Sequence, residues 1–96
     1  MTGSAPEGSE SDELPAIDFA TFVLSLSHSA LVHLGDAPDP SGGPVRRDVA
    51  MAKQTIDLLA VLQEKTEGNL TGAEERLLDQ VLYDLRMRYV EVTRSV

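Results

Sequence analysis

Two histidines stand in the stretch LSLSHSALVHLG, residues 24–35, and imidazole is a side chain that often binds metals or transfers protons. His28 and His33 are five residues apart, so on a helix the second ring is turned by about 140° from the first. Histidine pairs that bind one metal on a helix stand three or four residues apart. We therefore interpret both rings as packed imidazoles at helix–helix contacts and predict no metal and no cofactor. A pH-sensitive interface is a minor alternative.

Serines beside His28 invite comparison with a hydrolase, because a serine, a histidine and an acid can form an acyl-transfer triad. Ser25 precedes His28 by three residues, Ser29 follows it directly, and Asp36 comes just after the stretch. Nucleophilic catalysis also needs an oxyanion hole and an exposed hydroxyl, and the sequence has no Gly-x-Ser-x-Gly motif to supply that setting. We predict that the protein is not an enzyme and that these serines let helices approach closely.

Two arginines stand between two tyrosines in YDLRMRYVE, residues 83–91, and such side chains can stack on single-stranded bases. Tyr89, however, falls in the apolar stripe of its helix, and Asp84 stands four residues before Arg88, the spacing of a favourable ion pair. We expect these residues to be structural and expect no nucleic-acid partner. The alternative function is an RNA- or ribosome-associated factor that uses Arg46, Arg47, Arg86 and Arg88.

The distribution of charge also argues against a nucleic-acid groove. The chain has 96 residues and a net charge of −8. Residues 1–39 contain seven acidic residues and no Lys or Arg, whereas residues 40–96 contain nine acidic and eight basic residues. Acidity of this kind favours solubility and works against phosphate binding.

Cysteine is absent, so neither a disulfide nor a thiolate metal site can stabilise this small chain. The opening residues, MTGSAPEGSESDELP, have no basic segment and no apolar run, and we expect no secretory signal. The apolar run over 19–34 is sixteen residues long, shorter than the roughly 20 residues that span a bilayer. We expect a cytoplasmic protein without a membrane span.

Three helices and no strands are predicted, so the expected fold class is all-α. Residues 1–16 are rich in Ser, Gly, Pro and Glu and are predicted to form a disordered acidic tail. A single domain follows over residues 17–93. Its helices are expected at about 18–34, 48–66 and 71–93.

The connections differ in length. The Pro- and Gly-rich stretch 35–47 predicts a loop long enough for the first helix to reach away from the other two. The short link between the second and third helices predicts an antiparallel hairpin. Asp18 and Gly35 are expected to cap the first helix, and Asp48 the second. Thr71 and Glu74 have the spacing of a capping box at the start of the third.

The first helix is apolar or small nearly all round, because no charged residue occurs between Asp18 and Asp36 and Leu24 lies opposite the main apolar face. Such a helix is normally buried, and a chain of this size has little core to cover it. We therefore predict a homo-oligomer, most simply a dimer, assembled as a helical bundle. The predicted interface residues are Phe19, Phe22, Val23, Leu26, Ala30, Leu31 and Leu34.

Three long strings, FATFVLSLSHSALVHLGDAPDP, AKQTIDLLAVLQEKTEGNLT and EERLLDQVLYDLRMRYVE, make the chain resemble a bacterial family, domain of unknown function 1844. The resemblance covers about residues 17–92 and implies a small helical protein of the bacterial cytoplasm, with no catalytic residues to carry over. Gly72 departs from the family pattern, which tends to have Pro after the capping Thr, and Gly is the poorer helix start. The function we favour is a non-enzymatic, self-associating scaffold or interaction protein.

Overall fold

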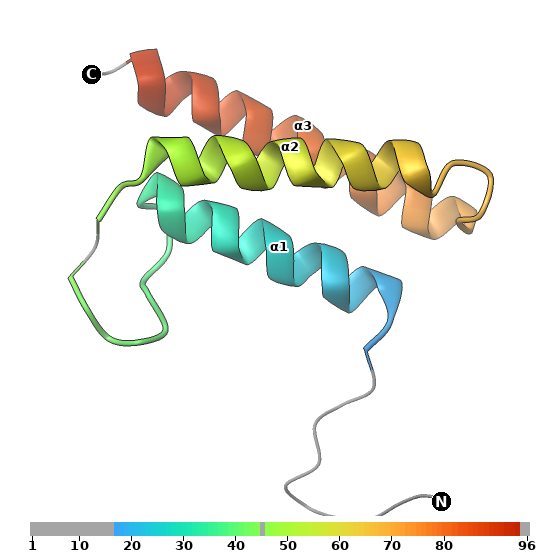
Figure 1. Ribbon diagram of the computed structural model, residues 1–96, viewed down its shortest axis with the longest axis horizontal. Coiled ribbons are helices and arrows are strands. Elements are labelled where there is room, and N and C mark those ends of the chain that lie inside the picture. The colour runs from blue at the N-terminus through green and yellow to red at the C-terminus, as the bar shows by residue number, and fades with distance from the viewer. Residues whose placement is uncertain (1–16, 45, 95–96) are drawn as a thin grey trace, which may run out of the picture.

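The chain folds into three packed helices. The computed structural model describes residues 17–44 and 46–94, and its helices are α1 (Phe19–Leu34), α2 (Val49–Lys65) and α3 (Gly72–Arg94). No strand occurs among the described residues, so the all-α prediction is confirmed there. Each helix packs against the other two, and α3 returns alongside α2 after a short turn (Figure 1). The predicted tail, residues 1–16, lies outside the described residues.

Polar residues fix the ends of α1 as the sequence predicts. The Asp18 carboxylate accepts a hydrogen bond from the Thr21 N–H at 2.8 Å. At the other end Gly35 adopts a φ of 83°, where a side chain is unfavourable. The Gly35 N–H donates to the Val32 carbonyl and the Asp36 N–H donates to the Leu31 carbonyl, which is a Schellman motif.

Capping side chains also start α2 and α3. Asp48 accepts from the Met51 N–H at 3.1 Å. The Thr71 hydroxyl accepts from the Glu74 N–H at 3.1 Å, and the Glu74 carboxylate accepts from the Thr71 N–H at 2.8 Å. The predicted capping box is therefore confirmed, and Gly72 does not prevent it.

Aliphatic side chains from all three helices form the core. α1 contributes Val23 and Ala30, which have no exposed surface. A second buried cluster lies where α1 ends and joins Leu34, Ala52 and Val92. The larger cluster contains Val23, Ala30, Ile56, Leu59, Leu78, Val81, Leu82 and Leu85.

Two hydrogen bonds join the last residues of the loop between α1 and α2 to the C-terminal end of α1. The Asp48 N–H donates to the His33 carbonyl at 2.7 Å, and the Arg47 guanidinium donates to the Leu34 carbonyl at 3.2 Å. These bonds satisfy carbonyls that the end of α1 leaves without helical partners. The expectation that a long loop lets α1 reach away is therefore wrong, because α1 packs on both other helices.

One arginine joins α3 to this loop. Arg88 donates from Nε and Nη2 to the two oxygens of Asp36, at 2.5 and 2.8 Å, and from Nη1 to Glu91 at 3.0 Å. The predicted Asp84–Arg88 pair is wrong: Asp84 instead accepts from the Gln80 amide at 2.9 Å. A bidentate partner 52 residues away replaces the local one, since Asp36 offers both carboxylate oxygens in the fork geometry that a guanidinium prefers. We call Gly35, Asp36, Arg47 and Arg88 the clasp.

Candidate functional site

An apolar surface extends over the neighbouring faces of α1 and α2. Two hollows make it up, and both are lined by Leu58 and Val61, so the surface is continuous. One hollow, of about 170 Å³, runs toward α1 and is lined also by Phe22, Leu26 and Leu62; the other, of about 450 Å³, runs along α2 toward Met51. We call this the α1/α2 surface and define it by Phe22, Leu26, Met51, Leu58, Val61 and Leu62.

Large apolar side chains of this surface face the solvent although a core lies directly beneath them. Phe22 is 43% exposed, Leu58 52% and Val61 50%. An isolated exposed leucine needs no explanation, but a contiguous apolar patch marks a site of interaction. The arrangement can therefore bind another apolar surface, and the energy would come from removing these side chains from water.

Two charged residues, Lys65 and Asp57, are among those that line the two hollows. Lys65 lines the hollow near α1, and Asp57 lines the hollow near Met51. Asp57 accepts a hydrogen bond from Lys53 at 2.8 Å, and this bond raises the pKa of Lys53 above its ordinary value. Both side chains of that pair are 60% exposed, so the pair is solvated, and both line the groove between α2 and α3.

The seven residues predicted as an oligomer interface divide between the core and the surface. Val23, Ala30 and Leu34 have no exposed surface and pack inside the chain itself. Phe19, Leu26 and Leu31 are half-buried against the core, and Phe22 is exposed. In this conformation only part of the predicted set, chiefly Phe22 and Leu26, has area that a partner could cover. The dimer itself stays a prediction.

The sequence reasoning missed the contribution of α2 to this surface. Met51, Leu58 and Val61 were overlooked because the buried face of α2, with Ala52, Ile56 and Leu59, already accounts for an amphipathic helix. A signal was nevertheless present. Residues 51, 58 and 61 follow the seven- and three-residue steps of a heptad seam, which predicts a second helix contact beside the core face.

The two histidines lie apart from the α1/α2 surface and differ in exposure. His28 is exposed and His33 is half-buried at the start of the loop. His33 lines a hollow of about 370 Å³ together with Asp39, Arg46 and Asp48. Within residues 17–44 and 46–94, no three His, Asp or Glu side chains come close enough together to hold a metal ion.

The four arginines of the alternative RNA-binding hypothesis do not form one patch. Arg88 is engaged by Asp36 and Glu91, and Arg47 by the Leu34 carbonyl. Arg46 lies in the loop hollow beside His33, whereas Arg86 lies in a separate groove between α2 and α3 with Tyr89 and Val90. The structure thus brings Arg47 and Arg88 together at Asp36, where both already have partners, and places Arg86 in another groove.

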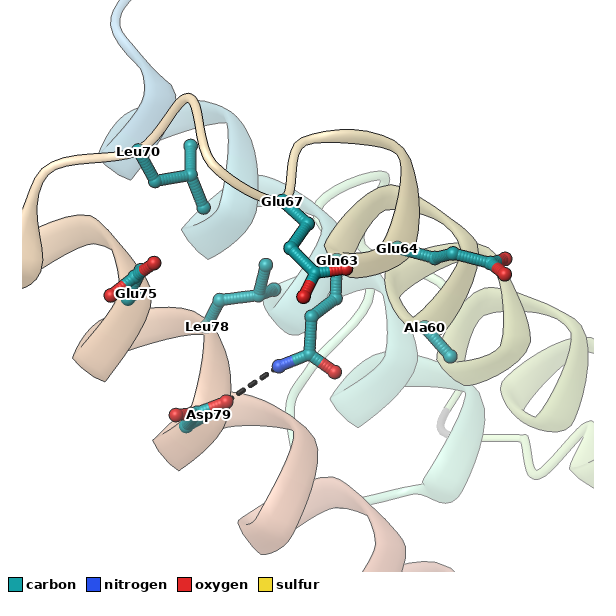
Figure 2. Close-up of a pocket in the computed structure, with 8 residues that line it drawn as sticks. All are labelled: Ala60, Gln63, Glu64, Glu67, Leu70, Glu75, Leu78 and Asp79. Atoms are coloured by element: carbon teal, nitrogen blue, oxygen red, sulfur yellow. Dashed lines mark hydrogen bonds between the residues drawn. The ribbon is translucent and has the colours of Figure 1, made fainter.

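An acidic cleft lies at the C-terminal end of α2, near the turn into α3 (Figure 2). Its volume is about 450 Å³, and Ala60, Leu70 and Leu78 contribute apolar walls. The Gln63 amide donates to Asp79 across the cleft at 2.5 Å, as the dashed line in Figure 2 marks. Carboxylates crowd this cleft without a basic side chain among its lining residues; they belong to Glu64, Glu67, Glu75 and Asp79.

None of the described helices is long and apolar enough to cross a membrane. No curated protein and no solved structure matches the chain significantly. A family profile described as Domain of unknown function (DUF1844) matches residues 16–91, which include all of α1 and α2 and most of α3. The match spans most of the chain and agrees with the resemblance seen in its three long strings. The chain therefore belongs to the DUF1844 family.

Proposed function

We propose that the protein is a small, non-enzymatic interaction protein that self-associates, most simply as a dimer, through its α1/α2 surface. The observation that carries the proposal is the continuity of the two apolar hollows across Leu58 and Val61. The antiparallel hairpin of α2 and α3 supports this surface, because packing against α3 fixes the orientation of α2. Oligomerisation is also a usual way for a small domain without disulfides to gain stability.

Two leucines with equal exposure provide the test. Leu58 on α2 and Leu24 on α1 are each 52% exposed, but only Leu58 belongs to the α1/α2 surface. We expect Leu58→Lys to raise the dimer dissociation constant on the order of 30-fold or more, since each copy loses about half a leucine of buried area and gains a charge. Leu24→Lys should leave the dissociation constant unchanged.

Sedimentation velocity over a micromolar concentration series measures both variants against the original chain. Because both positions are exposed, both variants should keep the circular dichroism spectrum of three helices. A chain that stays monomeric throughout the series contradicts the proposal. Equal weakening by the two lysines would show that association does not depend on the α1/α2 surface.

A further inference from the structure

The α1/α2 surface has different neighbours on the two sides of the α2 axis. On the side toward α1 its neighbours are apolar: Phe22, Leu26 and Leu62. On the other side stands the solvated Lys53–Asp57 ion pair. Along α2 itself, Met51, Gln54, Leu58, Val61 and Lys65 occupy successive heptad seam positions, with the two apolar residues Leu58 and Val61 in the middle.

This asymmetry limits how two copies can face one another. A two-fold dimer brings the same patch of both copies together. If the two α2 helices ran parallel, the apolar side of each copy would lie on the Lys53–Asp57 side of the other, and Lys65 would face its own mate. Covering that ion pair would remove it from water at a cost in free energy. If the helices run antiparallel, the apolar sides of both copies meet.

We infer that the dimer is antiparallel, with α2 packed on α2 about a two-fold axis that passes between the two helices, level with the midpoint between Leu58 and Val61. Leu58 of each copy then contacts Val61 of the other, and the Lys65 ammonium lies beside the Gln54 amide of the other copy. The apolar residues of α1 widen the contact on one edge, and the Lys53–Asp57 pairs of both copies meet at the opposite edge, where they remain accessible to water. This inference rests on the proposed self-association and specifies its geometry.

Charge placement supports a second copy of this chain as the occupant. Gln54 and Lys65 lie on either side of Leu58 and Val61 along the seam and are polar, so they can hydrogen-bond in water or to each other in the antiparallel register. The central apolar pair of one copy therefore matches that of the other, and Met51 lies beyond Gln54, outside this central match. No charged side chain of the described surface has to be buried at the centre, where Leu58 and Val61 are the residues shared by both hollows. A homodimer therefore desolvates apolar groups with little penalty from charged ones.

Absence of cysteine makes the geometry directly testable, because an introduced thiol can pair only with another introduced thiol. The variants are Gln54→Cys and Lys65→Cys, both at exposed positions. In the antiparallel register residue 54 lies opposite residue 65 of the other copy. Two copies of residue 54, or two of residue 65, stand about 17 Å apart along α2 at 1.5 Å per residue, too far for a disulfide.

We expect mild oxidation of a one-to-one mixture to give covalent dimer at least about tenfold faster than oxidation of either variant alone, with peptide mass spectrometry identifying the 54–65 link. Leu24→Cys, mixed with either variant, serves as the collision control and should cross-link only slowly. Faster linking within each single variant than in the mixture would establish a parallel dimer and overturn the inference. Rates no greater than those of the Leu24→Cys control would overturn it too.

Sedimentation of each reduced variant separates failure of the geometry from failure of the proposed function. If the reduced variants dimerise as the original chain does but link in the parallel pattern, self-association stands and the antiparallel arrangement is wrong. If neither the original chain nor the variants associate, the proposed function fails and this inference fails with it.

Discussion

The two connections between helices are held in place by different kinds of interaction. The turn from α2 to α3 is fixed by neighbours in sequence: Thr66 bonds back to Leu62, Gly68 adopts a φ of 85°, and Thr71 and Glu74 cap each other. The loop from α1 to α2 is fixed by the clasp, whose arginines reach across 13 and 52 residues. Figure 1 shows these two connections at opposite ends of the bundle. The first connection depends on interactions between residues close in sequence, whereas the second depends on interactions that form only when the helices pack together.

Two glycines allow this contrast to be measured. Gly35 and Gly68 have nearly the same positive φ, 83° and 85°, so alanine is strained at both. At Gly68 an added Cβ would meet open space, whereas at Gly35 it would lie 2.9 Å from the Arg47 Cγ. We expect Gly68→Ala to lower the free energy of unfolding by about 1 kcal/mol from backbone strain and Gly35→Ala by about 2 kcal/mol. The excess reports displacement of Arg47 from the Leu34 carbonyl.

Urea titrations followed by circular dichroism, at one fixed protein concentration, measure both changes, since association would make stability depend on concentration. Adding Arg47→Ala should remove the excess cost of Gly35→Ala and leave the cost of Gly68→Ala unchanged. Equal losses for the two glycines would show that Arg47 can move aside freely and that the clasp does not hold the loop.

Local signals in the sequence were enough to predict the helices and most of their ends. Residue type predicts the caps at Asp18, Gly35 and Asp48, and spacing predicts the capping box of Thr71 and Glu74. The clasp was not predictable in the same way. Asp36 and Arg88 become partners only when α1 and α3 pack side by side, and the sequence instead offered Asp84, four residues from Arg88, as the nearer candidate.

The candidate interaction surface was predictable only in part for a related reason. An uncharged α1 indicates excess apolar area, but it does not say which of its faces the other helices cover. Val23, Ala30 and Leu34 are covered within the chain, whereas Phe22 is not. Leu58 and Val61 complete the surface because packing brings this face of α2 beside α1. The heptad spacing of Met51, Leu58 and Val61 predicts an additional helix contact, but it does not say that α1 lies beside it.

The capping box tests the local side of the comparison. Thr71→Ala removes the acceptor of the Glu74 N–H, and we expect a loss of about 1 kcal/mol in the free energy of unfolding. The effect should be confined to the first turn of α3, so hydrogen exchange should accelerate there and stay unchanged in the loop 35–47. Thr71→Ser, which keeps the hydroxyl, is the matched control and should retain most of the stability. Faster exchange at both ends of the bundle would mean that the two connections are coupled.

The smallest expected effect concerns the carboxylate of the clasp and depends on pH. Hydrogen bonds from Arg88 lower the pKa of Asp36 below its ordinary value of 3.8, with help from the positive charges of Arg88 and Arg47 and against the effect of partial burial. The folded protein therefore holds this proton more weakly than the unfolded chain. The contribution of Asp36 to stability is complete above the ordinary pKa and is lost as the pH falls through the lower pKa of the folded state.

Asp36→Asn should accordingly lower the free energy of unfolding by about 0.5–1 kcal/mol at pH 7, since the pair lies near the surface and water screens it. At an acidic pH below the ordinary pKa of 3.8 the penalty should shrink, because the original carboxyl is then increasingly protonated as well. Urea titrations at both pH values measure it, and Arg88→Met supplies the matched background, in which Asp36→Asn should cost little at either pH. A penalty that is the same with and without Arg88 would show that Asp36 stabilises the loop by itself. The clasp would then be a local connection like the one at the other end of the bundle.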